Sequence, residues 1–200
     1  ERARAKGKQV WWYVCVEPKH AGPNLFIDRP GHEPRMLMGF MTAKMKPDGF
    51  LYYMVNRWPK LDCGPIKKGT FTDWNSGYSP ATGDGVVLAV REDGGPIGTV
   101  RMENFRDGLE DLAYYRLLET TVGELEKRDG MPTSSRQWLA RARETLTIPE
   151  ELVKNVEQYT RDGDVVQAYR DRIASLLQSS PIGVVEPAWP TIRGVERGVE

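Results

Sequence analysis

Two short apolar runs stand out along the chain, at residues 9–18 (QVWWYVCVEP) and 49–58 (GFLYYMVNRW). Each is too short for a core helix and ends at a proline or a polar cluster, which is typical of a buried strand. Because side chains alternate along a strand, each run has two faces. One face is mostly aliphatic, and the other mixes aromatic rings with groups that become polar toward the C-terminal end. The pattern predicts strands of a (β/α)8 barrel, with helices outside and a ligand site at the C-terminal edge.

The polar and aromatic faces of the two runs hold the candidate ligand-binding side chains. Aromatic rings suit the CH face of a sugar, while amide and carboxylate groups suit its hydroxyls. The candidates on these faces and in the following aromatic-rich loop are Tyr13, Glu17, Tyr52, Asn56, Trp58 and Trp74. Structural roles stay open for all of them. The tryptophans could instead cap the barrel, and the tyrosines could pack in the core with their hydroxyls hydrogen-bonded. Asn56 could bond to a neighbouring strand, and Glu17 could face solvent.

Helical periodicity and turn residues predict the remaining elements. Residues 35–46 (RMLMGFMTAKMK) carry the apolar stripe of one helix, in which Gly39 indicates close packing on the sheet. Strand, helix and strand then form a right-handed parallel crossover. A strand at residues 85–90 adds a third, so we expect three parallel strands. Further helices are expected at 101–128, 135–146, 149–159 and 164–178.

Charged residues gather where the longest predicted helix begins. A carboxylate in its first turn suits the helix dipole. We favour an ion-pair network that closes the barrel over ligand contact, and Asp28 and Arg35 are candidates for a similar pair. The residues of the expected network are Arg101, Glu103, Arg106 and Asp107.

Composition excludes several classes of function. The 200 residues contain 28 Lys+Arg and 28 Asp+Glu, so no basic surplus favours nucleic acid as a partner. No apolar run approaches the roughly 18 residues of a membrane span. Two cysteines and two histidines, without CxxC or HExxH spacing, give no metal site, no cofactor and no disulfide framework. A complete (β/α)8 barrel takes about 250 residues, so the length fits part of one.

Several motifs occur together and in order across residues 9–178. They are WWYVCVEP, PNLFID, Arg35 at a helix start, GFLYYMVNRW, Trp74-Asn75, VRMENFRDGLEDLAYYRLLE and LVKNVEQYTRDGDVVQAYRDRIASLL. In this combination the chain resembles the C-terminal part of the catalytic domain of glycoside hydrolase family 123 and of the related domain of unknown function 4091. One departure is Ala89-Val90-Arg91, where the family usually shows a Tyr-Pro-Gly-like turn.

The resemblance implies a fold, an activity and a division of the chain. Residues 9–128 would hold the last three strands of a (β/α)8 barrel with their helices, 129–178 a helical extension and 179–200 an irregular tail. The implied activity is β-N-acetylgalactosaminidase-like. In the family an Asp-Glu pair on an earlier strand does the chemistry: the Glu protonates the leaving oxygen, and the Asp orients the 2-acetamido group that attacks the anomeric carbon.

That pair is not in these residues, which contain no Asp-Glu dipeptide. We therefore expect no catalytic residue here, and expect the pair and the N-terminal half of the barrel upstream. The resemblance also favours a secreted or periplasmic protein acting on a carbohydrate. A non-catalytic carbohydrate-binding or scaffold protein on a degenerate barrel is the alternative. A freestanding α/β domain is disfavoured, since three strands leave both sheet edges open.

Overall fold

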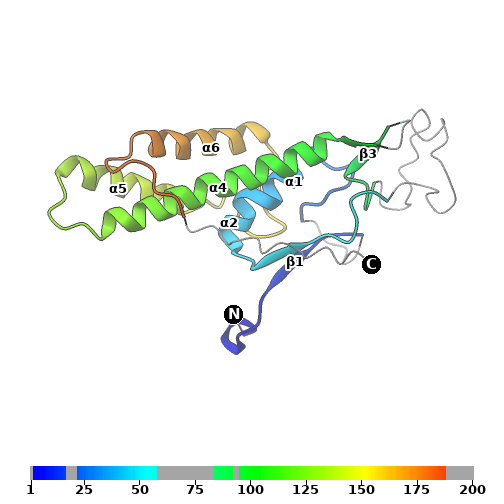
Figure 1. Ribbon diagram of the computed structural model, residues 1–200, viewed down its shortest axis with the longest axis horizontal. Helices are drawn as coiled ribbons and strands as arrows, with labels where there is room; N and C mark the ends of the chain where they lie inside the picture. The colour runs from blue at the N-terminus through cyan, green and yellow to red at the C-terminus, as the bar shows by residue number, and fades with distance from the viewer. Residues whose placement is uncertain (1, 17–21, 58–82, 92–94, 188–200) are drawn as a thin grey trace, which may run out of the picture.

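The computed structural model describes residues 2–16, 22–57, 83–91 and 95–187. Helix α4 runs along much of the molecule, with α6 on one side of it and strand β1 on the other (Figure 1). The elements, in chain order, are a 3-10 turn Arg4–Lys6, β1 Trp11–Tyr13, α1 Glu33–Met36, a π-helical segment Leu37–Met41, α2 Thr42–Met45, β2 Gly49–Leu51, β3 Leu88–Val90, β4 Pro96–Gly98, α4 Val100–Glu126, α5 Thr133–Leu146 and α6 Gly163–Gln178.

Strands β1 and β2 form a parallel pair, as the sequence predicts, although both are shorter than expected. Trp12 lies opposite Phe50, and Tyr13 opposite Leu51. The side of the pair that carries Trp12 and Phe50 packs against the apolar core, where Phe50 meets Phe105 of α4 with ring centroids 5.7 Å apart. The opposite side, which carries Trp11, stays exposed.

The expected third parallel strand is wrong in its pairing. Within the described residues, β3 pairs antiparallel with β4, and Val90 lies opposite Pro96. Pro96 opens the returning strand β4, a position where proline is tolerated. The second run still reaches this region, because Asn56 forms an isolated antiparallel bridge with Val86.

The alternation predicted for the second run continues through Tyr53 and then stops. Regular pairing ends at Leu51, and the chain then bends, so strict alternation stops. Tyr52 lies on the covered side with Phe50, Tyr53 lies on the exposed side with Leu51, and residues 54–56 are all exposed. Tyr13 and Tyr52 therefore do not share a face. The strand register decides this, because residues paired across parallel strands point to the same side.

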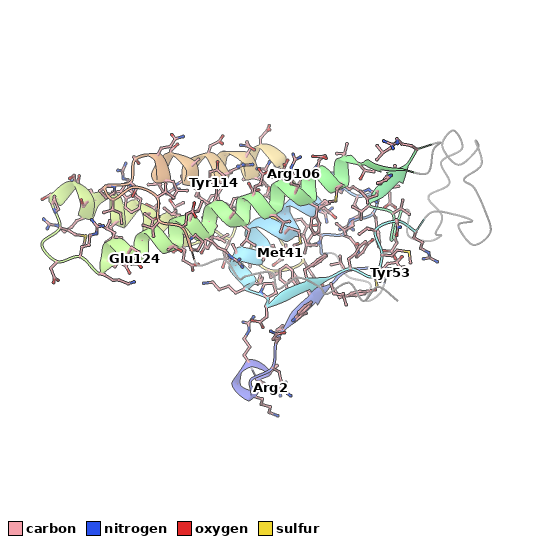
Figure 2. All side chains as sticks on the ribbon, in the orientation of Figure 1. Arg2, Met41, Tyr53, Arg106, Tyr114 and Glu124 are labelled. Atoms are coloured by element: carbon pink, nitrogen blue, oxygen red, sulfur yellow. The ribbon has the colours of Figure 1, made fainter. Side chains whose placement is uncertain are left out.

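The predicted helix at 35–46 forms, but as two α-helical turns around a π-helical segment with a kink at Gly39. Gly39 packs against α4 and not against the sheet: a Cβ there would lie 3.1 Å from Asp111 Cβ. On α4, Gly108 matches it, since a Cβ would lie 2.6 Å from the Arg35 carbonyl oxygen. The two glycines let these segments cross closely, which brings the side chain of Met41 into the core (Figure 2).

The C-terminal helices agree with the sequence except at one point. Helices α4, α5 and α6 lie within two residues of their predicted bounds. Residues 149–159 are wrongly predicted as helical and form turns with a Val153–Tyr159 bridge. The side-chain oxygen of Asn155 accepts the amides of Glu157 and Gln158, and this local bonding competes with a helix. Buried side chains from α4, α5 and α6 join one core with Phe40, whose ring contacts Tyr169 edge-on.

Candidate functional site

Three of the six predicted site residues lie in the described part of the chain, and all three lie near the C-terminal ends of β1 and β2. Tyr13 ends β1, and Tyr52 directly follows β2. Asn56 is exposed, and its main chain pairs with Val86, next to the 83–85 turn. The other three, Glu17, Trp58 and Trp74, lie outside the described residues.

A buried carboxylate, Asp84, forms the centre of this region. Its side chain is 2% exposed and accepts a hydrogen bond from the Tyr52 hydroxyl at 2.9 Å. The same hydroxyl accepts from the Gly85 amide at 2.8 Å, so Tyr52 both donates and accepts. Burial is the main cause that raises the pKa of the Tyr52 phenol, and the Asp84 charge adds to the rise. Tyr52 is therefore a neutral donor at neutral pH.

Arg101, the second residue of α4, forms hydrogen bonds with the turn that carries Asp84. This buried guanidinium donates to the carbonyls of Gly83 at 3.2 Å and Leu25 at 2.7 Å, and also to that of Val86. Burial lowers the pKa of the Arg101 guanidinium from its usual value. Gly83 and Gly85 both have φ of 78°, in the left-handed region that favours glycine, so Asp84 is flanked by two residues that permit the turn.

Two further phenols lie beside Asp84 on the exposed side of the strand pair. Burial is the first cause that raises the pKa of Tyr13 and of Tyr53. At Tyr13 the neighbouring Cys15 follows, and the Asp84 charge adds a smaller part to the pKa rise. At Tyr53 the hydrogen bond from Arg57 opposes the rise in pKa, and the Asp84 charge adds to it. The rings of Tyr52 and Tyr53 meet at 5.4 Å between centroids. Arg57 donates to the Tyr53 hydroxyl at 3.3 Å. Figure 2 shows Tyr53 at the end of the molecule that carries β3, far from Glu124.

The arrangement offers rings and protonated hydroxyls to a ligand on one accessible face. Tyr13 is 40% exposed and Tyr53 38%, and exposed apolar side chains adjoin them. A sugar ring has an apolar CH face and polar hydroxyls, so a site that binds it needs a flat apolar surface and a few oriented hydrogen-bond donors. The adjoining exposed side chains are Trp11, Leu51, Met54 and Val55.

Sequence reasoning missed Asp84 and Tyr53. Tyr53 shares the exposed side with Tyr13 because the register pairs Tyr13 with Leu51, and neither run encodes that register by itself. Asp84 stands between two glycines, Gly83-Asp84-Gly85, at the end of the predicted long loop, and this turn-forming pattern is the signal in the sequence that points to it. Neither residue resembles a catalytic motif by itself.

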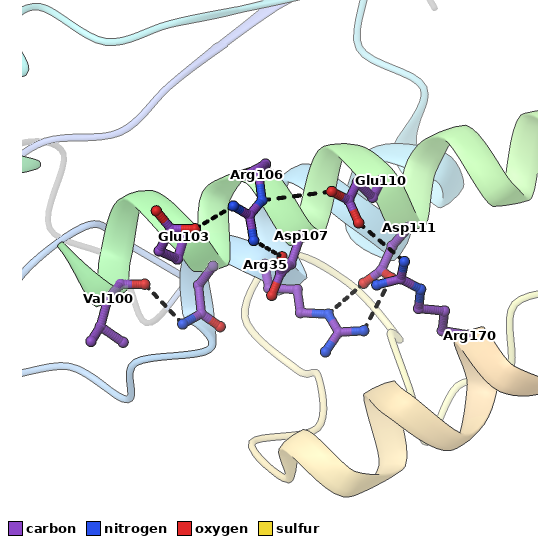
Figure 3. Close-up of polar contacts among 9 residues, drawn as sticks. Arg35, Val100, Glu103, Arg106, Asp107, Glu110, Asp111 and Arg170 are labelled. Carbon is purple, nitrogen blue, oxygen red and sulfur yellow. Dashed lines mark hydrogen bonds and ion pairs between the residues drawn. The ribbon is translucent and has the colours of Figure 1, made fainter. Parts of the chain in front are cut away.

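Three of the four residues of the predicted ion-pair network pair with one another, and their expected role in closing a barrel stays a prediction (Figure 3). On the surface of α4, Arg106 pairs with Glu103 at 2.5 Å, Asp107 at 3.2 Å and Glu110 at 3.6 Å. Arg101 is not part of it, because it bonds carbonyls beneath the Asp84 turn. Arg35 does not pair with Asp28 as suggested.

Its partner is Asp111, a fully buried carboxylate on α4. Arg35 contacts it through two nitrogens, at 2.6 and 3.1 Å, and Arg170 of α6 lies 3.5 Å from it. Burial raises the pKa of the Asp111 carboxyl, and Arg35 opposes that rise. These contacts lie on the helical side of the molecule, so the network is structural.

Two hollows of the described surface lie away from this region. One of about 430 Å³ lies between α5 and α6, and one of about 250 Å³ between α2 and α4. Among the described residues no group of three or more His, Cys, Asp or Glu side chains is placed to hold a metal ion. Over the same residues, no helix has the length and apolar character needed to cross a membrane.

A family model described as glycoside hydrolase 123, catalytic domain, matches residues 1–118. The matched part contains β1, β2, the Asp84 turn and most of α4, and ends before α5 and α6. No curated protein matches the chain.

Proposed function

The chain belongs to the glycoside hydrolase 123 catalytic domain family, and on that premise we propose that it forms one wall of the sugar site of a hydrolase of β-linked glycans. The leading substrate is a 2-acetamido hexosamine. Strands β1 and β2 with their helices are, on this proposal, the C-terminal part of a (β/α)8 barrel. Their exposed face then lines the barrel interior, and the C-terminal edge of the strands is the edge where barrel enzymes bind substrate.

One observation supports the proposal most strongly: the buried Asp84 carboxylate lies among three phenols at that edge. Tyr52 donates to Asp84, and the raised pKa of Tyr13 and of Tyr53 leaves both hydroxyls protonated, so both phenols are available as hydrogen-bond donors. Their rings add apolar surface beside them. Trp58, Trp74, Asn56 and Glu17 extend the proposed wall from the residues that follow the two strands.

Bond cleavage on this proposal is carried out by an Asp-Glu pair that precedes these residues in the protein. Its Glu is the proton donor, and its Asp orients the acetamido group of the substrate as the internal nucleophile. Such substrate-assisted hydrolysis differs from the usual schemes with two protein carboxylates. Asp84 is buried and already bonded to Tyr52, which suits a positioning role and not proton donation.

The test uses the full-length protein with aryl 2-acetamido-2-deoxy-β-galactoside and its gluco epimer. We expect hydrolysis by the wild type, and an increase in KM of about tenfold or more for Tyr53→Phe, which removes one donor to the sugar. Trp58→Ala is expected to weaken catalysis through lost ring stacking, and Asn56→Ala by leaving polar groups unpaired at a cost of about 1–3 kcal/mol.

Tyr114→Phe is the matched control, because Tyr114 lies under Arg170 on the helical side, 4.9 Å from ring centroid to guanidinium carbon. It is expected to leave KM unchanged. Normal kinetics in folded Tyr53→Phe, Trp58→Ala and Asn56→Ala proteins would remove these residues from the site. A folded wild type that binds the sugar and never cleaves it would favour the carbohydrate-binding alternative.

A further inference from the structure

A second buried carboxylate, Glu33, connects the C-terminal extension to the edge that carries the proposed sugar site. Glu33 opens α1 and is fully buried. Within the described residues its carboxylate accepts three hydrogen bonds: from the Tyr159 hydroxyl at 2.9 Å, from Arg29 Nε at 2.9 Å and from the main-chain amide of Asn24 at 3.0 Å. Tyr159 is 126 residues away in sequence and lies outside the part of the chain that matches the family.

The hydrogen bonds of Asn24 link Glu33 to the main chain just after β1. Its side-chain nitrogen donates to the Cys15 carbonyl at 3.0 Å, two residues after Tyr13. Its side-chain oxygen accepts the Leu25 amide at 2.7 Å, which fixes the turn of the main chain at this point. Asn24 is itself buried, so each of these bonds is costly to lose. The main chain just beyond Tyr13 is therefore held by a residue that Glu33 holds in turn.

Leu25, the residue after Asn24, is linked through Arg101 to the turn that carries Asp84. Its carbonyl accepts from Arg101, and the same guanidinium holds Gly83 and Val86, which flank the Asp84 turn. Residues 24 and 25 therefore lie between two buried charges, Glu33 on one side and Arg101 on the other. Every step from Tyr159 to the Asp84 turn is a hydrogen bond or an adjacent residue.

We propose that Tyr159 is a positioning residue for the sugar site, acting through Glu33 and Asn24. It follows that the extension beyond residue 118 is part of the working unit, because it supplies one of the three donors that fix Glu33. Precise placement of binding groups depends on such supporting bonds, and a small displacement weakens substrate binding. The inference rests on the proposed function, since it assigns the effect to sugar binding at that edge.

The test compares Tyr159→Phe with Tyr169→Phe in the full-length protein. Tyr169 is the matched control, because it also lies in the extension, is buried, and donates its hydroxyl, in this case to the Thr145 carbonyl. Each variant loses one hydroxyl and one hydrogen bond. For Tyr159→Phe we expect KM for the aryl glycoside to rise about three- to tenfold, with kcat within about twofold of the wild type. Tyr169→Phe is expected to keep both constants.

Hydrogen exchange gives a second readout that does not need activity. In Tyr159→Phe the amides of residues 22–29 and 83–87 are expected to exchange faster than in the wild type and in Tyr169→Phe. Equal exchange and equal KM in the two variants would overturn the inference. If Tyr159→Phe does not fold, Asn24→Ala removes the contact to Cys15 while leaving Tyr159 and Glu33 in place, and must raise KM in the same way.

The two proposals fail in different ways. A wild type without any hydrolysis contradicts the proposed function, while the exchange experiment still decides whether Tyr159 holds residues 22–29 and 83–87. If the wild type is active and Tyr159→Phe behaves like Tyr169→Phe, only the positioning role is contradicted.

Discussion

Substituting two glycines of the same helix is expected to change stability in opposite directions. Gly108 and Gly123 both lie inside α4, and neither has a left-handed backbone conformation. At Gly123 an added Cβ would meet no heavy atom within 4 Å. At Gly108 it would lie 2.6 Å from the carbonyl oxygen of Arg35 and 2.9 Å from its Cα. Both of these atoms belong to the main chain, so neither can move aside by rotating a side chain.

The magnitudes follow from these contacts. Alanine in a helix interior is favoured over glycine by about 1 kcal/mol, so Gly123→Ala is expected to gain up to that amount. Overpacking costs about 1–3 kcal/mol, and a main-chain clash lies at the upper end of that range. After the gain in helix propensity, Gly108→Ala is expected to lose about 2 kcal/mol. The displaced residue, Arg35, also carries the buried ion pair to Asp111, so relaxation there is restricted.

The assay is urea unfolding of the full-length protein and both variants, followed by circular dichroism at constant pH. The free energy of unfolding is expected to rise for Gly123→Ala and to fall for Gly108→Ala. Stabilisation of similar size in both variants would refute the reasoning, because it would mean that Arg35 does not approach α4 as closely as the structure has it. Loss of stability in Gly123→Ala would instead contradict the open surroundings of that position.

Two further predictions concern buried ionisable groups. Arg35→Leu is expected to lower the free energy of unfolding in urea by about 3–5 kcal/mol, since it leaves the buried Asp111 carboxylate without its main partner. The raised pKa of Asp111 means that the folded state binds a proton more readily than the unfolded chain, so the loss of stability is expected to shrink as pH falls. A loss that grows as pH falls would refute the assignment. Burial raises the pKa of Tyr115 and of Tyr159 to about 12, so the unfolded chain ionises first as pH rises through about 10. Stability is therefore expected to hold below that pH and to fall above it, with a shallower fall in Tyr159→Phe.

The sequence by itself determined the elements whose residues repeat regularly. Residues 35–46 and the helices α4, α5 and α6 form where the sequence predicts helices, with nearly the expected bounds. The parallel pairing of β1 and β2 also followed from sequence, because a short helix between two apolar runs restricts their connection. The family resemblance was readable for the same reason, as ordered motifs are local features, and the family match confirms it.

The tertiary structure alone decided which faces and which charges matter. The register that pairs Tyr13 with Leu51 puts Tyr53 on the exposed side with Tyr13, and Tyr52 on the covered side, and the pattern of a single run does not encode its register. The turn around Asn155 replaced a helix, because a side chain bonded the local main chain. Asp84, Arg101 and Glu33 became important only when distant carbonyls and hydroxyls met them, since burial of a charge depends on partners far away in sequence.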